Sequence, residues 1–390
     1  MGTTGGEQWD TVIVGAGQAG CAAAYDLVLR GMRVLLVERA DFPRVKPCAG
    51  GVTIKALNAL RFSIAPVVRC VVRDMALSTD GGTVQHIAGP APMLVTTVRA
   101  ELDAFCLDRA VERGAVFSNR GTDRIVAVDQ SPSQAVLRFA SGASEAARFV
   151  IAADGANSTI RRLTGLKKVQ RAFALEGHMP MPGANRRQLA FDFGAVQGGY
   201  GWIFPKGDHL NIGLYTQDED VNLSRDALHS YARTATGSGL LDGVVGHPLG
   251  IDGHGAASSV GRVLFAGDAA GTCERLLGEG IHNAIKSGQA AAAAILSAHG
   301  CPRRAASVLR QEQAPVARDV AACARGAQTF YGSAAARRTA LAFKPVTSAF
   351  RSGFAAGMTF RDIAATAALY SFYAVNPVRS ITEHEQARAV

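Results

Sequence analysis

The six residues 15–20 (GAGQAG) constrain the fold of this chain more than any other segment. They directly follow a short apolar run, residues 10–14 (DTVIV), and they precede a helix-like stretch at residues 21–30. A second apolar run, residues 33–38 (RVLLVE), comes next. A strand, a glycine-rich turn, a helix and a second strand within thirty residues are typical of the βαβ unit that binds dinucleotides.

Each glycine of this GxGxxG pattern has a physical role. Gly15 permits a tight turn, Gly17 lets the backbone approach a pyrophosphate, and Gly20 allows the helix to pack close to the strand. The N-terminus of that helix attracts the anion. Glu38 ends the second strand, where its carboxylate can accept hydrogen bonds from ribose hydroxyls. The pattern predicts a dinucleotide site, but by itself it does not separate NAD from FAD.

Two later segments bear on which dinucleotide is bound. Residues 149–162 (FVIAADGANSTIRR) read as a buried strand that runs into an Asp-Gly pair. Residues 263–281 (VLFAGDAAGTCERLLGEGI) read as an apolar strand that ends at a Gly-Asp pair and a second glycine-rich turn. With the GxGxxG turn, these motifs resemble in their order the FAD-dependent proteins of the aromatic-hydroxylase fold. The resemblance implies FAD, since an NAD dehydrogenase is not expected to carry the two extra motifs.

Further segments narrow the resemblance to one branch of that fold. The Gly-Asp motif lacks the GDAAH ending of the hydroxylase branch and continues as GEGIHNAIKSGQAAA at residues 278–292. Residues 42–51 read FPRVKPCAGG and residues 200–207 read YGWIFPKG. Together these motifs resemble the geranylgeranyl reductase family over roughly residues 10–300. One position departs from the family, because many relatives carry Asn-Pro where this chain has Glu274 and Arg275. Arg275 is interpreted as a solvent-facing side chain or as a contact for an anionic head group.

The resemblance also assigns site residues. It implies that Asp268 bonds the ribityl chain of FAD, that Asp154 and Gly155 lie by the pyrophosphate and ribose, and that Arg99 contacts the middle of the cofactor. Backbone N–H groups around Gly280 would stabilise negative charge on the reduced flavin. The complete set expected to bind FAD is Gly15, Gly17, Gly20, Glu38, Arg39, Cys48, Ala49, Gly50, Arg99, Asp154, Gly155, Gly267, Asp268, Gly278, Gly280 and Ile281.

The segment KPCAGG at residues 46–51 carries the main catalytic candidate. By the resemblance it crosses over the isoalloxazine ring, where side chains would collide and glycine is needed. Cys48 would then direct its thiol towards the substrate as a proton donor or a substrate-shaping group. The competing interpretation is a small buried hydrophobic side chain. Tyr200 and Trp202 lie within the YGWIFPKG motif and complete the candidate catalytic set.

The rest of the chain predicts an α/β fold in three parts. Residues 1–72, 98–168 and 256–300 form an FAD-binding Rossmann-like domain. Strand-like runs in residues 73–97 and 169–255 predict one antiparallel sheet, a substrate-binding domain that covers the flavin. Residues 301–390 form a C-terminal helical region. The substrate sheet carries an aromatic lining suited to an elongated apolar ligand, namely Phe191, Phe193, Tyr200, Trp202, Phe204 and Tyr215.

Composition limits the partners and the compartment. The net charge is +9, but the arginines are dispersed and not interleaved with aromatic residues, which argues against nucleic acid. Seven scattered cysteines without a CxxC pair indicate reduced thiols and no metal site. The amino terminus lacks a signal-peptide pattern, and no apolar run approaches the ~20 residues of a spanning helix. We expect a cytoplasmic protein and leave open a peripheral membrane contact through residues 342–375.

The expected activity is transfer of a hydride from reduced FAD to carbon–carbon double bonds of a prenyl lipid or pigment precursor. Only one dinucleotide motif is evident, so electrons would arrive transiently from NAD(P)H or from a small redox protein. Two alternatives stay open. One is a flavin-dependent monooxygenase acting on a small apolar or aromatic substrate, and the other is a flavin redox carrier or sensor without catalysis. The sequence does not determine the exact substrate or the oligomeric state.

Overall fold

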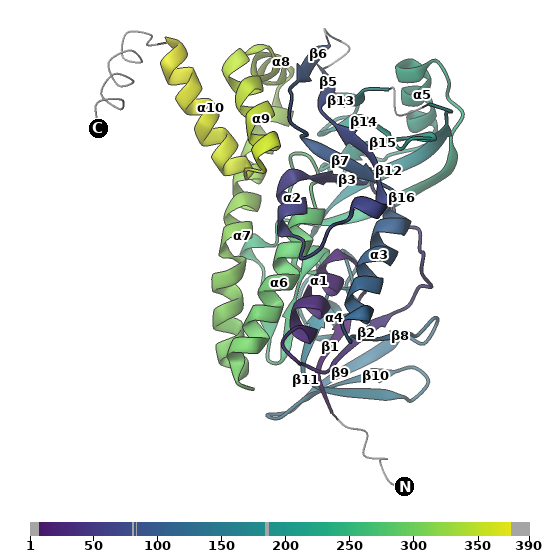
Figure 1. The fold of residues 1–390 in the computed structure, drawn as a ribbon, viewed down its shortest axis with the longest axis vertical. Coiled ribbons are helices and arrows are strands. Elements are labelled where there is room, and N and C mark those ends of the chain that lie inside the picture. The colour runs from purple at the N-terminus through teal and green to yellow at the C-terminus, as the bar shows by residue number, and fades with distance from the viewer. Residues whose placement is uncertain (1–7, 80–81, 83, 184–186, 376–390) are drawn as a thin grey trace.

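The described residues form three β-sheets, helices that pack on them, and a group of carboxy-terminal helices (Figure 1). The computed structural model describes residues 8–79, 82, 84–183 and 187–375. The first seven residues, part of the amino terminus examined for a signal peptide, lie outside this description. An α/β architecture with a C-terminal helical region is confirmed.

The first sheet is the dinucleotide-binding sheet, in the order β17-β18-β11-β1-β2-β8. Neighbours from β18 to β8 pair in parallel, whereas β17 pairs antiparallel with β18. The hairpin of β9 and β10 extends it from β11. Its strands are β1 (Trp9–Val14), β2 (Val34–Glu38), β8 (Val116–Asn119), β9 (Ile125–Gln130), β10 (Ala135–Phe139), β11 (Ser144–Ala152), β17 (Ser259–Val260) and β18 (Val263–Phe265).

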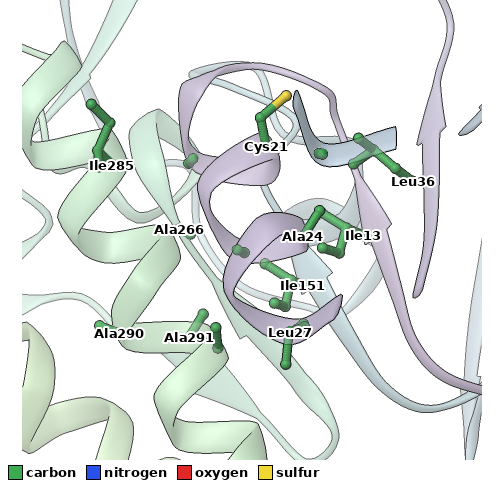
Figure 2. Packing of buried hydrophobic residues seen from close by; sticks show 14 of the residues in the cluster. Ile13, Cys21, Ala24, Leu27, Leu36, Ile151, Ala266, Ile285, Ala290 and Ala291 are labelled. Atoms are coloured by element: carbon green, nitrogen blue, oxygen red, sulfur yellow. The ribbon is translucent and has the colours of Figure 1, made fainter. Parts of the chain in front are cut away.

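Helices cover this sheet because its central strands are apolar on both faces. The helices are α1 (Gln18–Val28), α2 (Ile54–Ala59), α3 (Arg99–Glu112), α4 (Thr159–Leu163) and α6 (Ile281–Ala298). Helices α1 and α6 approach closely, since a Cβ placed on Gly288 would lie 2.1 Å from the carbonyl oxygen of Ala19. Figure 2 shows Leu27 of α1 and Ala291 of α6 in the same buried cluster as Ile13 and Ile151 of the sheet.

The second sheet, the substrate sheet, runs in the order β16-β12-β15-β14-β13-β5-β6. All its pairs are antiparallel except β13 with β5, which are parallel. In the sequence, strands β8 to β11 of the first sheet lie between β5 and β13. So long a connection permits parallel pairing. The strands are β5 (Asp74–Thr79), β6 (Gln85–Ala88), β12 (Gln170–Pro180), β13 (Leu189–Phe193), β14 (Gly199–Pro205), β15 (His209–Thr216) and β16 (Asp242–Ile251). Helix α5 (Arg225–Thr236) covers its outer face.

A small third sheet joins the two larger ones. It contains β3 (Gly51–Thr53), β7 (Leu94–Thr97) and β4 (Val68–Val72), in the order β3-β7-β4. Residues 94–97 therefore do not join the single antiparallel sheet that the sequence predicted for residues 73–97. They pair instead with the strand that follows the KPCAGG segment.

The carboxy-terminal helices pack beside both larger sheets. They are α7 (Pro302–Gly332), α8 (Ala334–Ala342), α9 (Lys344–Ala356) and α10 (Phe360–Val375). Helix α7 lies along α6, and α8 and α9 contact β5 and β6. Helices α9 and α10 pack on each other at the upper end of Figure 1. Among the described residues, none of these or the other helices combines the length and hydrophobicity needed to cross a membrane.

Candidate active site

A cavity lies where the glycine turn of the first sheet, the third sheet and the substrate sheet meet. Most of the predicted site residues line it. They are Gly17, Cys48, Ala49, Gly50, Arg99, Gly155, Tyr200, Trp202, Gly267, Asp268, Gly278, Gly280 and Ile281. The remaining predicted residues, Gly15, Gly20, Glu38, Arg39 and Asp154, are not among its walls. The sequence motifs thus converge on one cavity from segments far apart in the chain.

The glycines of the first turn serve two different purposes. A Cβ on Gly20 would lie 1.9 Å from the carbonyl oxygen of Gly15, and a Cβ on Gly15 would lie 2.3 Å from that of Ala153. Packing of the protein therefore requires both glycines. Gly17 differs, because its φ is −80° and its Cβ would meet only the Arg44 side chain, at 3.5 Å. The protein alone tolerates a side chain at position 17, so glycine there leaves room for a bound group to approach the backbone.

Glu38 lies beside this turn at the end of β2. Its carboxylate accepts hydrogen bonds from the backbone N–H groups of Ala16, at 3.1 Å, and Arg39, at 2.8 Å. The Arg39 side chain itself is exposed. The carboxylate is thus held at the turn by backbone bonds, within reach of a ribose bound there.

The two residues of the Asp-Gly pair after β11 have different surroundings. Asp154 bonds the start of helix α4, and Gly155 lines the cavity. The carboxylate of Asp154 accepts hydrogen bonds from the Ser158 hydroxyl, at 2.6 Å, and from the backbone N–H of Ile160, at 3.1 Å. Burial raises the pKa of Asp154, and these bonds oppose the shift. Gly155 lines the cavity with φ at +81°, a conformation that favours glycine.

The KPCAGG segment, which we call the strap (residues 46–51), forms one wall of the cavity. A Cβ on Gly50 would lie 2.2 Å from the carbonyl oxygen of Thr97, and one on Gly51 would lie 2.7 Å from the ring of Phe204. These two glycines are therefore required by contacts within the protein. The Sγ of Cys48 accepts a hydrogen bond from the backbone N–H of Gly50 at 3.3 Å.

Two buried cations flank the strap. Lys206 donates hydrogen bonds to the carbonyl oxygens of Ala49 and Thr97, the latter at 2.8 Å. Burial lowers its pKa to about 8. Arg99 makes a two-pronged bond with Asp103, with N–O distances of 2.8 to 3.0 Å. Burial opposes the charge on Arg99, but the neighbouring Asp103 carboxylate raises the pKa of Arg99. The thiol of Cys48 interacts with the same guanidinium.

The substrate sheet supplies an aromatic wall whose polar atoms are all bonded. Trp202 donates from Nε1 to Oδ1 of Asn211 at 2.7 Å. Tyr215 donates to the carbonyl oxygen of Arg275 at 2.8 Å, and Tyr200 donates to that of Leu277. Because these bonds satisfy the polar atoms, the rings contribute mainly apolar surface to the cavity.

Arg275 does not project freely into solvent. Its guanidinium pairs with Asp252 and donates to the side chain of Gln170. The interpretation as a solvent-facing arginine is thus only partly right, since its charge is matched within the protein.

A second, smaller cavity adjoins the first. The two share Thr53, Leu277, Glu279 and Phe354 as walls. The carboxy-terminal helices supply the apolar part of the second cavity, through Phe350, Phe354, Met358, Phe360 and Ile363. On its polar side, Lys55 pairs with Glu279 at 2.6 Å. The two cavities therefore adjoin on the side of the carboxy-terminal helices, where Phe354 lines both.

Three side chains that the sequence did not single out support the cofactor side. Arg44 lies 3.1 Å from Asp103 and 3.7 Å from Glu38, so it links the two acidic groups. Gln18 donates to Asp103 at 2.8 Å. Arg44 belongs to the FPRVKP motif, and Asp103 follows Arg99 by one helical turn. The i, i+4 spacing of Arg99 and Asp103 could have predicted their ion pair from the sequence.

The chemistry of the cavity fits FAD. The turn at Gly17 and the N-terminus of α1 suit a pyrophosphate, and the Arg44 guanidinium lies beside Gly17. Asp268 is half-buried on the short helix Gly267–Ala270 and lies at the cavity wall. The carboxylate of Asp268 also lies near Gly280 at the start of α6.

Known proteins share these features. A family model described as an FAD binding domain matches residues 8–181. The chain is 33% identical over 298 residues to an uncharacterized protein of Methanosarcina barkeri, covering 75% of each chain. It is 32% identical over 310 residues to the menaquinone reductase of Mycolicibacterium smegmatis, covering 73% of this chain and 75% of that one. It is 29% identical over 315 residues to the chloroplastic geranylgeranyl diphosphate reductase of Oryza sativa, covering 75% and 67%.

Solved structures share the fold. A geranylgeranyl bacteriochlorophyll reductase-like protein from Thermoplasma acidophilum superposes with a TM-score of 0.80 at 18% identity, covering 96% of this chain and 99% of that one. The flavin-dependent halogenase CmlS gives a TM-score of 0.68 at 20% identity, covering 96% and 78%. At these identities the likeness concerns the fold, which serves reductases and halogenases alike. FAD is the cofactor that the family match and the cavity support together.

Proposed function

Because this chain belongs to the geranylgeranyl reductase family of FAD-dependent oxidoreductases, we propose that it reduces carbon–carbon double bonds of a prenyl chain. The observation that carries this proposal is the aromatic wall of the cavity together with the apolar side of the second cavity, which adjoins the first at Phe354. Apolar surface on this scale suits an isoprenoid chain better than a small polar substrate.

The names of the relatives agree with a prenyl substrate but differ in its head group. They refer to geranylgeranyl diphosphate, to menaquinone and to a digeranylgeranylglycerophospholipid. A prenyl chain is the chemistry common to all three. We therefore propose that this cavity recognises the prenyl chain of the substrate and not a particular head group.

In this proposal the protein positions the substrate and manages the proton. When bound, reduced FAD supplies the hydride that adds to one carbon of the double bond. Cys48 lies at the middle of the strap and holds a proton at Sγ that can pass to the neighbouring carbon. Tyr200 and Trp202 orient the chain through their ring faces, because their polar atoms are bonded to Leu277 and Asn211. The aromatic wall also excludes water from the reacting carbons.

The electrons reach the flavin from outside the chain in this account. NAD(P)H or a small redox protein would donate them transiently.

A prenyl lipid would enter from a membrane, and helix α10 exposes Leu369 and Tyr370, 51% and 40% accessible respectively. We assign this helix to peripheral lipid contact. The double variant Leu369→Glu, Tyr370→Glu should lose co-sedimentation with anionic phospholipid vesicles, and unchanged co-sedimentation would reject the assignment.

The spectrum of the flavin tests the proposed reaction. The holoprotein is reduced chemically without oxygen and then mixed with geranylgeranyl diphosphate or with its fully saturated analogue. We expect the unsaturated compound alone to restore the absorption of oxidised flavin. If neither compound oxidises the flavin and only air does, the reductase proposal fails and a monooxygenase or carrier takes its place.

A further inference from the structure

The loop of residues 273–280 is organised around one buried carboxylate. Glu274 is 3% exposed, and its two oxygens accept three backbone hydrogen bonds. Oε2 accepts from the N–H of Leu276 at 2.6 Å, and Oε1 accepts from those of Leu277 at 2.8 Å and Glu279 at 2.9 Å. The carboxylate therefore satisfies three N–H groups of the loop that no helix or strand satisfies.

Three tyrosines hold the carbonyl side of the same loop. Tyr215 on β15 donates to the carbonyl oxygen of Arg275 at 2.8 Å, and Tyr331 on α7 donates to that of Leu276 at 2.5 Å. Tyr200 on β14 donates to that of Leu277. Three successive carbonyl groups are thus bonded to the substrate sheet and the carboxy-terminal helices. Hydrogen bonds from both sides therefore restrain the loop.

This loop is a wall of the cofactor cavity. Residues 277–281 line the cavity, and the loop ends at the N-terminus of α6. Gly278 has φ at +68° and lies against the Tyr215 ring, since a Cβ there would be 3.3 Å from it. Any change in the loop conformation would move the first backbone N–H groups of α6, which are the groups that can stabilise charge on a bound flavin.

Residues 274 and 275 are also where the sequence departs from the family resemblance, which implies an Asn-Pro pair there. A proline restricts the backbone directly. Among the residues that the structure describes, the backbone N–H of Arg275 has no hydrogen-bond acceptor. A proline at 275 would therefore cost no backbone bond. The two solutions are alternatives for shaping the same loop.

We propose that Glu274 is a positioning residue that shapes the 273–280 loop for FAD through its three backbone hydrogen bonds, in place of an Asn-Pro pair. This inference rests on FAD as the cofactor and is independent of which substrate the protein reduces. Burial raises the pKa of Glu274, and the backbone N–H groups oppose that shift. The bonds thus have to retain a carboxylate in a site that disfavours its charge.

The experiment compares four variants of the holoprotein. Glu274→Gln keeps the size but has one oxygen, so at least one N–H loses its acceptor. Glu274→Asn alone shortens the side chain and disrupts the three backbone hydrogen bonds of Glu274. The double variant Glu274→Asn, Arg275→Pro introduces the Asn-Pro pair that the family resemblance implies. Arg275→Ala controls for the lost ion pair with Asp252. The readouts are the FAD dissociation constant on dilution, the midpoint potential of the bound flavin, and the thermal midpoint of unfolding.

We expect Glu274→Gln and Glu274→Asn to weaken FAD binding about tenfold, as loss of a hydrogen bond to a charged group predicts, and to shift the flavin potential. The double variant should return both values to within about threefold of wild type, and Arg275→Ala should change neither. Wild-type affinity and potential in Glu274→Gln would overturn the proposal. So would a variant whose thermal midpoint falls while its affinity and potential stay unchanged, because Glu274 would then support only the fold.

Discussion

Lys206 and Thr97 join the substrate sheet to the small third sheet through a hydrogen bond of 2.8 Å between Nζ and a backbone carbonyl oxygen. Lys206 directly follows β14, and Thr97 ends β7. The same ammonium group also bonds Ala49 of the strap. One buried lysine therefore fixes the strap against the aromatic wall opposite.

The titration of Lys206 should be visible in the stability of the protein. Its pKa is lowered from 10.5 to about 8 on folding. Between these two values the unfolded chain binds a proton that the native protein does not, so stability rises with pH. We expect the free energy of unfolding to gain roughly 2 kcal/mol between pH 8 and pH 10 relative to Lys206→Met. Urea titrations at each pH measure it, and parallel curves for both proteins would contradict it.

Two alanine substitutions in the glycine turn should separate folding from cofactor binding. Gly20→Ala places a Cβ 1.9 Å from the carbonyl oxygen of Gly15, so it should destabilise the fold by several kcal/mol. Gly17→Ala meets only the end of the flexible Arg44 side chain, at 3.5 Å, and should fold normally. It should nevertheless bind FAD at least tenfold more weakly. Normal FAD affinity in Gly17→Ala would show that the turn does not approach the cofactor.

The role of Cys48 can be separated from packing. Cys48→Ala removes the sulfur that accepts from Gly50 and leaves the neighbouring charge of Arg99 without it. We expect the single-turnover rate of flavin oxidation by the prenyl substrate to fall at least tenfold, with a changed flavin potential. Cys70→Ala, at another half-buried thiol, is the matched control. If rate and potential both stay at wild-type values, Cys48 is a packing residue.

Phe354 should control the length of the substrate, because its side chain lines both cavities. Phe354→Trp should narrow the passage and reduce binding of C20 prenyl compounds more than that of C10 compounds. Phe354→Ala should relax that preference at a cost of about 2–4 kcal/mol in stability. Quenching of flavin fluorescence by each compound measures binding, with Phe343→Ala on the exposed surface as control. Equal losses of affinity for C20 and C10 compounds would contradict a passage for the prenyl tail between the two cavities.

The sequence was most informative where local chemistry decides the structure. The GAGQAG turn, the Asp-Gly and Gly-Asp pairs and the YGWIFPKG strand each need particular residues at particular spacings, so their convergence could be predicted. Gly17, Gly155 and Asp268 do lie at one cavity. The roles assigned to them there remain predictions.

What could not be predicted depends on contacts between distant segments. The glycines of the strap were attributed to the flavin, yet Gly50 and Gly51 are already required by Thr97 and Phe204. The pairing of β5 with β13, and of β7 with β3, arises from tertiary packing that periodicity does not encode. Glu274 was noted only as a departure from the family pattern, because a carboxylate that accepts hydrogen bonds from its own loop leaves no signature in the sequence.

The central claim is that this flavoprotein saturates a prenyl chain. The most direct test is mass spectrometry of geranylgeranyl compounds after anaerobic incubation with the chemically reduced holoprotein. The account predicts a gain of two hydrogen atoms for each double bond reduced, with no change in the head group. An unchanged mass without oxygen, followed by the gain of an oxygen atom once air is admitted, would contradict it and identify a monooxygenase.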